Sequence, residues 1–189
     1  MIREVSETLV DVIHQATPDI GTWVSLSSLS AADVDPTTNR LAVALYAVEE
    51  HPHLRNRPLV SSPAGYVRAP LALRLHYLMT YVGSHDEAQS RLARVIAVFH
   101  TKPIIEQPQM TPALAAQVET ITVRLTTTTP DERNQIWGAL GRSARLALFY
   151  EVDVAPVDLI THEVAGAIDT HRIRSVSYTH LTLPTILRV

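Results

Sequence analysis

The sequence predicts an α+β domain in which helices pack on one face of a mixed, mainly antiparallel β-sheet. The first observation is the segment 70–83, in which every odd position from 71 to 81 is apolar. The second is a similar alternation along 144–154, and the third is that helical segments separate some of the predicted strands but not others. A period of two indicates a strand with one buried face. Direct hairpins mixed with helical crossovers predict a mixed sheet.

The N-terminal part combines one helix with two strands. Residues 2–16 carry an apolar stripe at helical spacing, and 17–21 contain residues that end a helix. Segment 23–29 alternates as a short strand, and segment 41–48 is apolar on both sides, which predicts a central strand covered on both faces. The helical stripe consists of Ile2, Val5, Leu9, Val12, Ile13 and Ala16.

Residues 49–69 have no apolar period and contain three prolines and one glycine. We expect an extended surface loop here. A loop of about twenty residues is uncommon in a domain unless it has a function. The long strand follows, with Pro70 at its start and Gly83 at its end, where both residue types are tolerated.

A capping box opens the next helix. The Ser84 hydroxyl can accept from the Glu87 N–H while the Glu87 carboxylate accepts from the Ser84 N–H. The helix is expected to stop at Lys102 and Pro103. Its predicted buried residues are Ala88, Leu92, Val95, Ile96 and Phe99.

A second capping box, formed by Thr129 and Glu132, opens a helix that ends at Gly141. Before it come a helical turn that starts at Pro112 and a half-exposed strand over 117–126. After it comes the strand 144–154, which Pro156 ends. The apolar residues of the predicted helix are Ile136, Trp137 and Leu140; those of the last strand are Leu146, Leu148, Tyr150, Val152 and Val154.

The C-terminal residues do not continue this pattern. The run VSYTHLTLPT at 176–185 has the look of a translated sequencing adapter, so residues from about 175 on are left out of the fold prediction. We therefore predict a single domain over 1–160, a C-terminal extension over 161–174 and a non-native, adapter-derived tail over 175–189.

Composition excludes several classes of function. The chain has 189 residues, a net charge of −3 and no cysteine, so it has neither a global charge that favours nucleic acid or anionic membranes nor any thiol chemistry. No apolar run approaches the roughly 20 residues of a membrane span, and the acidic N-terminus is unlike a signal peptide. We expect a cytoplasmic protein that binds neither nucleic acid nor membrane.

Few residues suggest catalysis. His51 and His53 flank a proline, and an H-x-H pair can bind Zn²⁺ with Glu49 or Glu50 as a further ligand, although a loop pair of this kind is more often simply solvated. Gly141-Arg-Ser lacks the second glycine of a nucleophile elbow, and no phosphate-binding glycine motif is present. We predict no enzyme, cofactor or metal. A small metal-dependent hydrolase using His51 and His53 and a regulatory protein-interaction module stay as alternatives.

Four segments together resemble one family. They are HPHLRNRP at 51–58, PLALRLHYLMTY at 70–81, HDEAQSRLARVIAVFH at 85–100 and YEVDVAP at 150–156. In order and spacing they are similar to the N-terminal domain of the tube-terminating cap protein of contractile injection systems, the phage-tail-like particles of bacteria. The similarity covers roughly 2–160, and some relatives continue into further domains.

The resemblance implies a tail-terminator-like fold and a structural role without catalysis. Members of this family form a ring, thought to be hexameric, on the end of the inner tube and sheath and stop polymerisation. The implied partners are tube and sheath proteins and further copies of the chain, first in the cytoplasm and then in the assembled particle. In the 49–69 loop, Arg55, Arg57, Tyr66 and Arg68 are residue types enriched at interfaces, so we expect this loop to form the contact surface.

Overall fold

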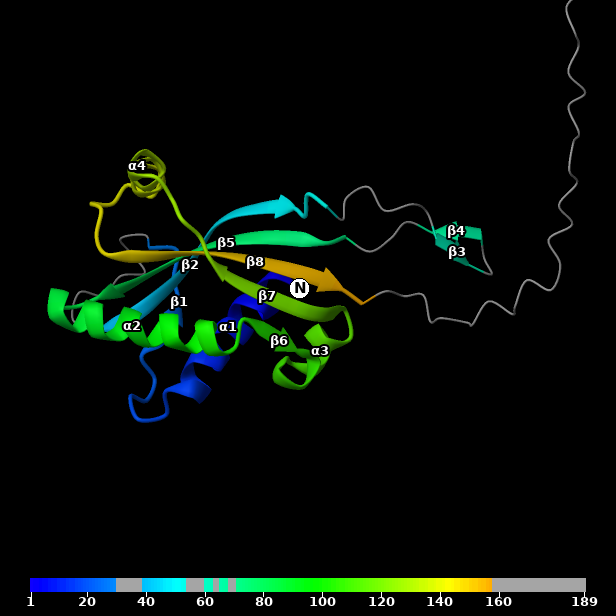
Figure 1. Cartoon of the computed structure of the whole chain (residues 1–189), viewed down its shortest axis with the longest axis horizontal. Coiled ribbons are helices and arrows are strands. Elements are labelled where there is room, and N and C mark those ends of the chain that lie inside the picture. The colour runs from blue at the N-terminus through cyan, green and yellow to red at the C-terminus, as the bar shows by residue number, and fades with distance from the viewer. Residues whose placement is uncertain (30–38, 54–59, 63–64, 68–70, 158–189) are drawn as a thin grey trace, which may run out of the picture. The chain divides into compact units, whose positions relative to one another are not determined.

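Two β-sheets form the framework of the part of the chain that the computed structural model describes, residues 1–29, 39–53, 60–62, 65–67 and 71–157 (Figure 1). Among these residues the larger sheet has six strands. Their spatial order is β1 (Val24–Leu26), β2 (Arg40–Glu50), β5 (Leu73–Val82), β8 (Ala147–Pro156), β7 (Val118–Leu125) and β6 (Ile104–Glu106). β1 pairs with β2 in parallel, and the other neighbouring pairs are antiparallel. The predicted mixed, mainly antiparallel sheet is confirmed.

The strand predicted at 70–83 is β5, in the interior of this sheet. It pairs with β2 on one side and with β8 on the other, so that Tyr77 lies opposite both Leu45 and Tyr150. Its odd residues point to one face, where Leu75 and Tyr77 are fully buried. Leu71, which the alternation places on the same face, is 56% exposed because it precedes the strand.

Helices α1 (Ile2–Ala16), α2 (His85–Thr101) and α3 (Pro112–Ala115) lie on this face of the sheet (Figure 1). Their apolar side chains form one core cluster with those of β5. The buried apolar residues of α1 are Val5, Leu9, Val12 and Ile13, all from the predicted stripe. In α2, by contrast, Ile96 is 39% exposed and Val98 is buried instead. The reason is that α1 lies beside the Val98 side of α2, where Ala16 and Val98 line one groove.

A second apolar cluster lies on the opposite face of the sheet, under α4 (Pro130–Ala139). It consists of Leu29, Ala42, Ala44, Leu78, Trp137 and Phe149. The expectation that helices pack on one face therefore holds for α1, α2 and α3, and α4 departs from it because the even positions of β5 include the large apolar Leu78. Residues 41–44 of β2 are buried, as predicted for a strand covered on both faces.

A β-bulge in β2 changes which of its residues point to each face. Leu45 points to the face covered by α1 and α2, whereas the next paired residue, Ala47, lies opposite His76 on the other face. Tyr46 is the extra residue between them. Beyond the bulge the odd positions, including Glu49, lie on the α4 side of the sheet.

Four short elements are absent from the sequence prediction. In the segment expected to be irregular, β3 (Val60–Ser62) and β4 (Gly65–Val67) pair as an antiparallel two-stranded sheet, so that expectation was wrong for these residues. β6 and the 3₁₀-helix η1 (Gln107–Gln109) lie between α2 and α3 along the chain. Three residues are too few for an apolar period to be recognised. No helix in the described ranges has the length and apolar character needed to cross a membrane.

Two apolar residues at strand ends are more exposed than their alternation predicts. Leu125 is 54% exposed and is the last residue of β7, and Leu146 is 43% exposed and precedes β8. Alternation assigns a face to a side chain but does not show where the helices that cover that face end.

The capping predictions are confirmed with one difference. At α4 both halves of the box form, and the Glu132 carboxylate accepts from the Thr129 N–H at 2.7 Å. At α2 the Glu87 N–H donates to the Ser84 hydroxyl at 3.3 Å, as expected. The Glu87 carboxylate, however, accepts from the Ser84 hydroxyl and from the Asn39 amide, not from the Ser84 N–H.

Candidate functional site

The residues predicted to contact a partner fall on the part of the chain that is least described. Arg55, Arg57 and Arg68 lie outside the described residues. Tyr66 belongs to β4, but its side chain also lies outside the description. The contact surface on the 49–69 segment therefore stays a prediction.

The two histidines of the hydrolase alternative lie just beyond the end of β2. The His53 N–H donates to Nδ1 of His51 at 3.3 Å, and Nε2 of His51 is 3.6 Å from Oδ2 of Asp153. Both ring nitrogens of His51 thus face groups of the protein itself. Across the described ranges, no three His, Asp or Glu side chains are grouped so that they could hold a metal ion. The geometry gives the hydrolase alternative no support.

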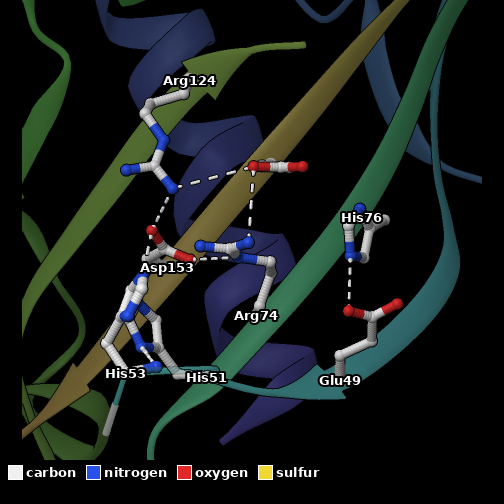
Figure 2. Close-up of polar contacts among 8 residues, drawn as sticks. Glu49, His51, His53, Arg74, His76, Arg124 and Asp153 are labelled. Atoms are coloured by element: carbon white, nitrogen blue, oxygen red, sulfur yellow. Dashed lines mark hydrogen bonds and ion pairs between the residues drawn. The ribbon is translucent and has the colours of Figure 1, made fainter. Parts of the chain in front are cut away.

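The densest polar cluster of the described chain lies on the outer face of the sheet, the face that carries α4. We call it the charge ladder. It consists of Glu49, His51, Arg74, His76, Arg124, Glu151 and Asp153 (Figure 2). The strand register assembles it, because directly opposite residues on neighbouring strands have adjacent side chains. Arg74 lies opposite Glu49 and Asp153, and Glu151 lies opposite Arg124.

Asp153 is the centre of the ladder. Its Oδ1 accepts from Nε of Arg74 at 2.8 Å, and its Oδ2 contacts the guanidinium of Arg124. Glu151 lies within 3.9 Å of Arg74 and 3.7 Å of Arg124, so both arginines lie between two carboxylates. Figure 2 shows the two guanidinium groups converging on Asp153 from β5 and β7, with His51 close by.

Electrostatics keep Asp153 ionised. Burial by itself would raise the pKa of this carboxyl, since its side chain is only 12% exposed. The hydrogen bond from Arg74 and the charges of Arg124, Arg74 and His51 outweigh burial and hold the pKa below its ordinary value. The same hydrogen bond raises the pKa of Arg74. A charged pair held in this way stabilises structure but supplies neither a general acid nor a general base near neutral pH.

The predicted alternation of β5 and β8 implies the facing of the cluster members on these strands, but it does not show their association. Alternation correctly places Arg74, His76, Glu151 and Asp153 away from the main core. It does not show that β5 and β8 are neighbours, nor that Arg124 of β7 joins them. The available signal was the opposite charge carried by the polar faces of these segments.

The comparisons with known proteins come from sequence and from structure. The sequence profile described as the Pvc16 N-terminal domain matches residues 4–168. No sequence among curated proteins matches the chain significantly.

Two solved structures are similar. One is the cryo-EM structure of an extracellular contractile injection system, the PVC sheath/tube terminator in the extended state, with a TM-score of 0.60 and 17% identity over 98% of this chain. The other is that of the anti-feeding prophage cap, the AFP tube terminating cap, with a TM-score of 0.47 and 19% identity over 84% of this chain. The chain spans 65% of the length of the first and 53% of the second. The first likeness shows a shared fold.

Proposed function

Because the chain belongs to the family of the Pvc16 N-terminal domain, we propose that it caps and terminates the tube and sheath of a phage-tail-like contractile injection system. The observation that carries this proposal is the family match, which extends over nearly all the described residues. The fold shared with a sheath/tube terminator supports it. The proposed role is structural and needs no catalytic group or cofactor.

In this proposal the protein works as a ring of identical copies. A closed ring requires a heterologous interface, in which one patch of each copy meets a different patch of the next. We propose six copies, as in the family that the sequence resembles. A rigid subunit suits this role, and the two core clusters with the charge ladder between neighbouring strands supply that rigidity.

The proposed partners are the last tube ring and the last sheath ring. The segment that contains Arg55, Arg57, Tyr66 and Arg68 is the proposed contact surface. We propose that residues 1–160 form the cap domain, that 161–174 extend it and that 175–189 are not native. Assembly would take place in the cytoplasm, and the protein would then be part of the finished particle.

Electron microscopy of particles from a strain that lacks the protein tests the proposal. We expect tubes and sheaths of variable, mostly excessive length, with the normal length restored by the full-length gene. Uniform particles of normal length in the deletion strain would overturn the proposal. Light scattering of the purified chain tests the ring separately, since a monomer that stays stable at high concentration would favour a regulatory interaction module.

A further inference from the structure

Exposed apolar side chains gather at two places on the side of the six-stranded sheet that α1 and α2 cover. Eight large apolar side chains of the described residues are exposed, and six of them fall into two groups. The other two, Leu26 and Ile104, lie on the edge strands β1 and β6. Single exposed apolar residues are common on any protein surface, whereas grouped ones mark interaction sites. The two groups are therefore candidates for a protein contact.

The first group, which we call the Leu125 patch, consists of Ile96, Leu125 and Leu146. Leu125 ends β7 and lies opposite Tyr150, whose ring packs against Phe99 of α2 with the ring centroids 5.2 Å apart. Ile96 lies one turn before Phe99, on the flank of α2 that is turned away from α1. Leu146 directly precedes β8, the neighbour of β7. The patch therefore belongs to the β7 side of the domain.

The second group, which we call the Val48 patch, consists of Ile2, Val48 and Leu71. Val48 lies beyond the bulge of β2, on the face that α1 covers. Ile2 is in the first turn of α1, one turn before Ser6, whose hydroxyl forms a hydrogen bond of 2.7 Å with the Tyr77 hydroxyl. Leu71 lies two residues before β5. The patch therefore belongs to the end of the domain where β2 ends and β5 and α1 begin.

Buried residues separate the two patches. Tyr150 and Tyr77 lie in line between Leu125 and β2, and both are buried under the helices. One chain thus carries two different apolar patches in the same compact unit. A heterologous contact between identical copies needs this arrangement, because one patch of each copy meets a different patch of the next.

The unpaired charges beside the two patches are opposite in sign. Glu50 is exposed and lies at the end of β2, on the same face as Val48. Arg145 is exposed and directly precedes Leu146. Within the described residues neither Glu50 nor Arg145 has an ion pair. By contrast, the N-terminal ammonium and the charged side chains of the first two turns of α1 pair with one another. The Val48 patch therefore has an acidic neighbour that needs a partner, and the Leu125 patch has a basic one.

We propose that the Leu125 patch of one copy packs against the Val48 patch of the next copy, with Arg145 beside Glu50. A second copy of the chain fits best as the partner, because the same chain supplies both apolar patches and both opposite charges. Apolar burial supplies the affinity, and the charges determine which patch meets which, since two like patches would bring like charges together. That this contact closes a ring rests on the proposed function, whereas the contact itself needs no particle.

Cross-linking of the full-length chain tests the contact, because the chain contains no cysteine and single cysteines can be introduced. Glu50→Cys and Arg145→Cys change exposed positions and leave both apolar patches intact. A short bis-maleimide added to a mixture of the two variants at high protein concentration should give a covalent dimer. Either variant alone should stay monomeric, and the double variant should give a series of higher oligomers. No dimer in the mixture, or as much dimer with one variant alone, would overturn the proposal.

A substitution in the Leu125 patch tests the apolar part of the contact. Leu125→Gln, placed in the copy that carries Arg145→Cys, should raise the concentration for half-maximal cross-linking about fivefold, the effect of no longer burying half of a leucine side chain. The matched control is Ile104→Gln, because Ile104 is 52% exposed against 54% for Leu125 and lies on the outer face of the sheet. The control should cross-link as the unaltered pair does. The same concentration dependence for both variants would contradict the proposal.

The interface and the cap can fail separately. Cross-linking uses the chain alone, so a missing dimer would refute the interface and leave the cap proposal, which the deletion strain tests, intact. Uniform particles in the deletion strain, together with a cross-linked dimer, would refute the cap and leave the contact between copies intact.

Discussion

Replacing Arg74 by methionine, which keeps most of the apolar stem and removes the charge, tests whether the charge ladder stabilises the fold. Arg74 is 18% exposed and donates a hydrogen bond of 2.8 Å to Asp153, which is 12% exposed. The loss of a hydrogen bond between charged groups costs about 1.5–3 kcal/mol, and breaking a buried ion pair costs about 3–5 kcal/mol. Asp153 keeps Arg124 and the nearby His51 in the variant. We therefore expect a loss of about 2 kcal/mol in the free energy of unfolding, near the lower of these ranges.

Urea denaturation at pH 7, followed by circular dichroism, measures this loss. The control is Arg3→Met, which removes a guanidinium that is 84% exposed and pairs with Glu7 on the surface of α1; its stability should not change measurably. Arg74→Met and Arg3→Met with the same midpoint would refute the stabilising role of the ladder.

The pH dependence follows from the lowered pKa of Asp153. A carboxyl with a lowered pKa in the folded state adds stability above its ordinary value of 3.8, and that contribution disappears as pH falls through the folded pKa. The difference between the unaltered chain and Arg74→Met should therefore be full at pH 7 and should shrink below about pH 4. A difference that stays constant down to pH 2 would show that the effect is not electrostatic.

Three further predictions concern the core, a helix cap and two buried tyrosines. Leu75→Asp places an unpaired charge at a fully buried position of β5, so we expect loss of the cooperative unfolding transition; a folded variant would show that the facing of the strand is wrong. Thr129→Ala removes a hydroxyl that accepts from the Glu132 N–H, and we expect a loss of about 1 kcal/mol in urea denaturation; Thr129→Ser should restore most of it. Burial raises the pKa of Tyr77 and Tyr150 to about 12, so in a spectrophotometric titration both should ionise only as the chain unfolds. Because their unfolded pKa is near 10, stability should fall as pH rises above about 10, and Tyr77→Phe should reduce that slope.

Most of the fold could be predicted because strong local patterns agree with the tertiary contacts. The strand around Leu75 and Tyr77 and the helix opened by Thr129 each have a period or a cap that no other element type shares. The elements that escaped prediction are short. β6 and the β3–β4 pair have three residues per strand, which is less than two full periods of alternation.

The charge ladder could be predicted only in part, for a different reason. The pattern shows that Arg74 points away from the main core, and from that alone a substitution there would be expected to cost less than about 1 kcal/mol. The side chain of Arg74 is nearly buried and pairs with Asp153. Asp153 is distant in sequence and becomes a neighbour of Arg74 only through the order of the strands. Strand order is set by non-local contacts, which no local pattern contains.

The bulge at Tyr46 decides which side chains of the outer half of β2 meet the charge ladder. If residue 46 instead took a regular place opposite His76, without a bulge, the outer half of the strand would turn over about its own axis. The carboxylate of Glu49 would then point into the hydrocarbon packed beneath the helices, and the isopropyl group of Val48 would replace it among the charges. Deletion of residue 46 would not have this effect, because Ala47 would then follow Leu45 directly and Glu49 would stay opposite Arg74.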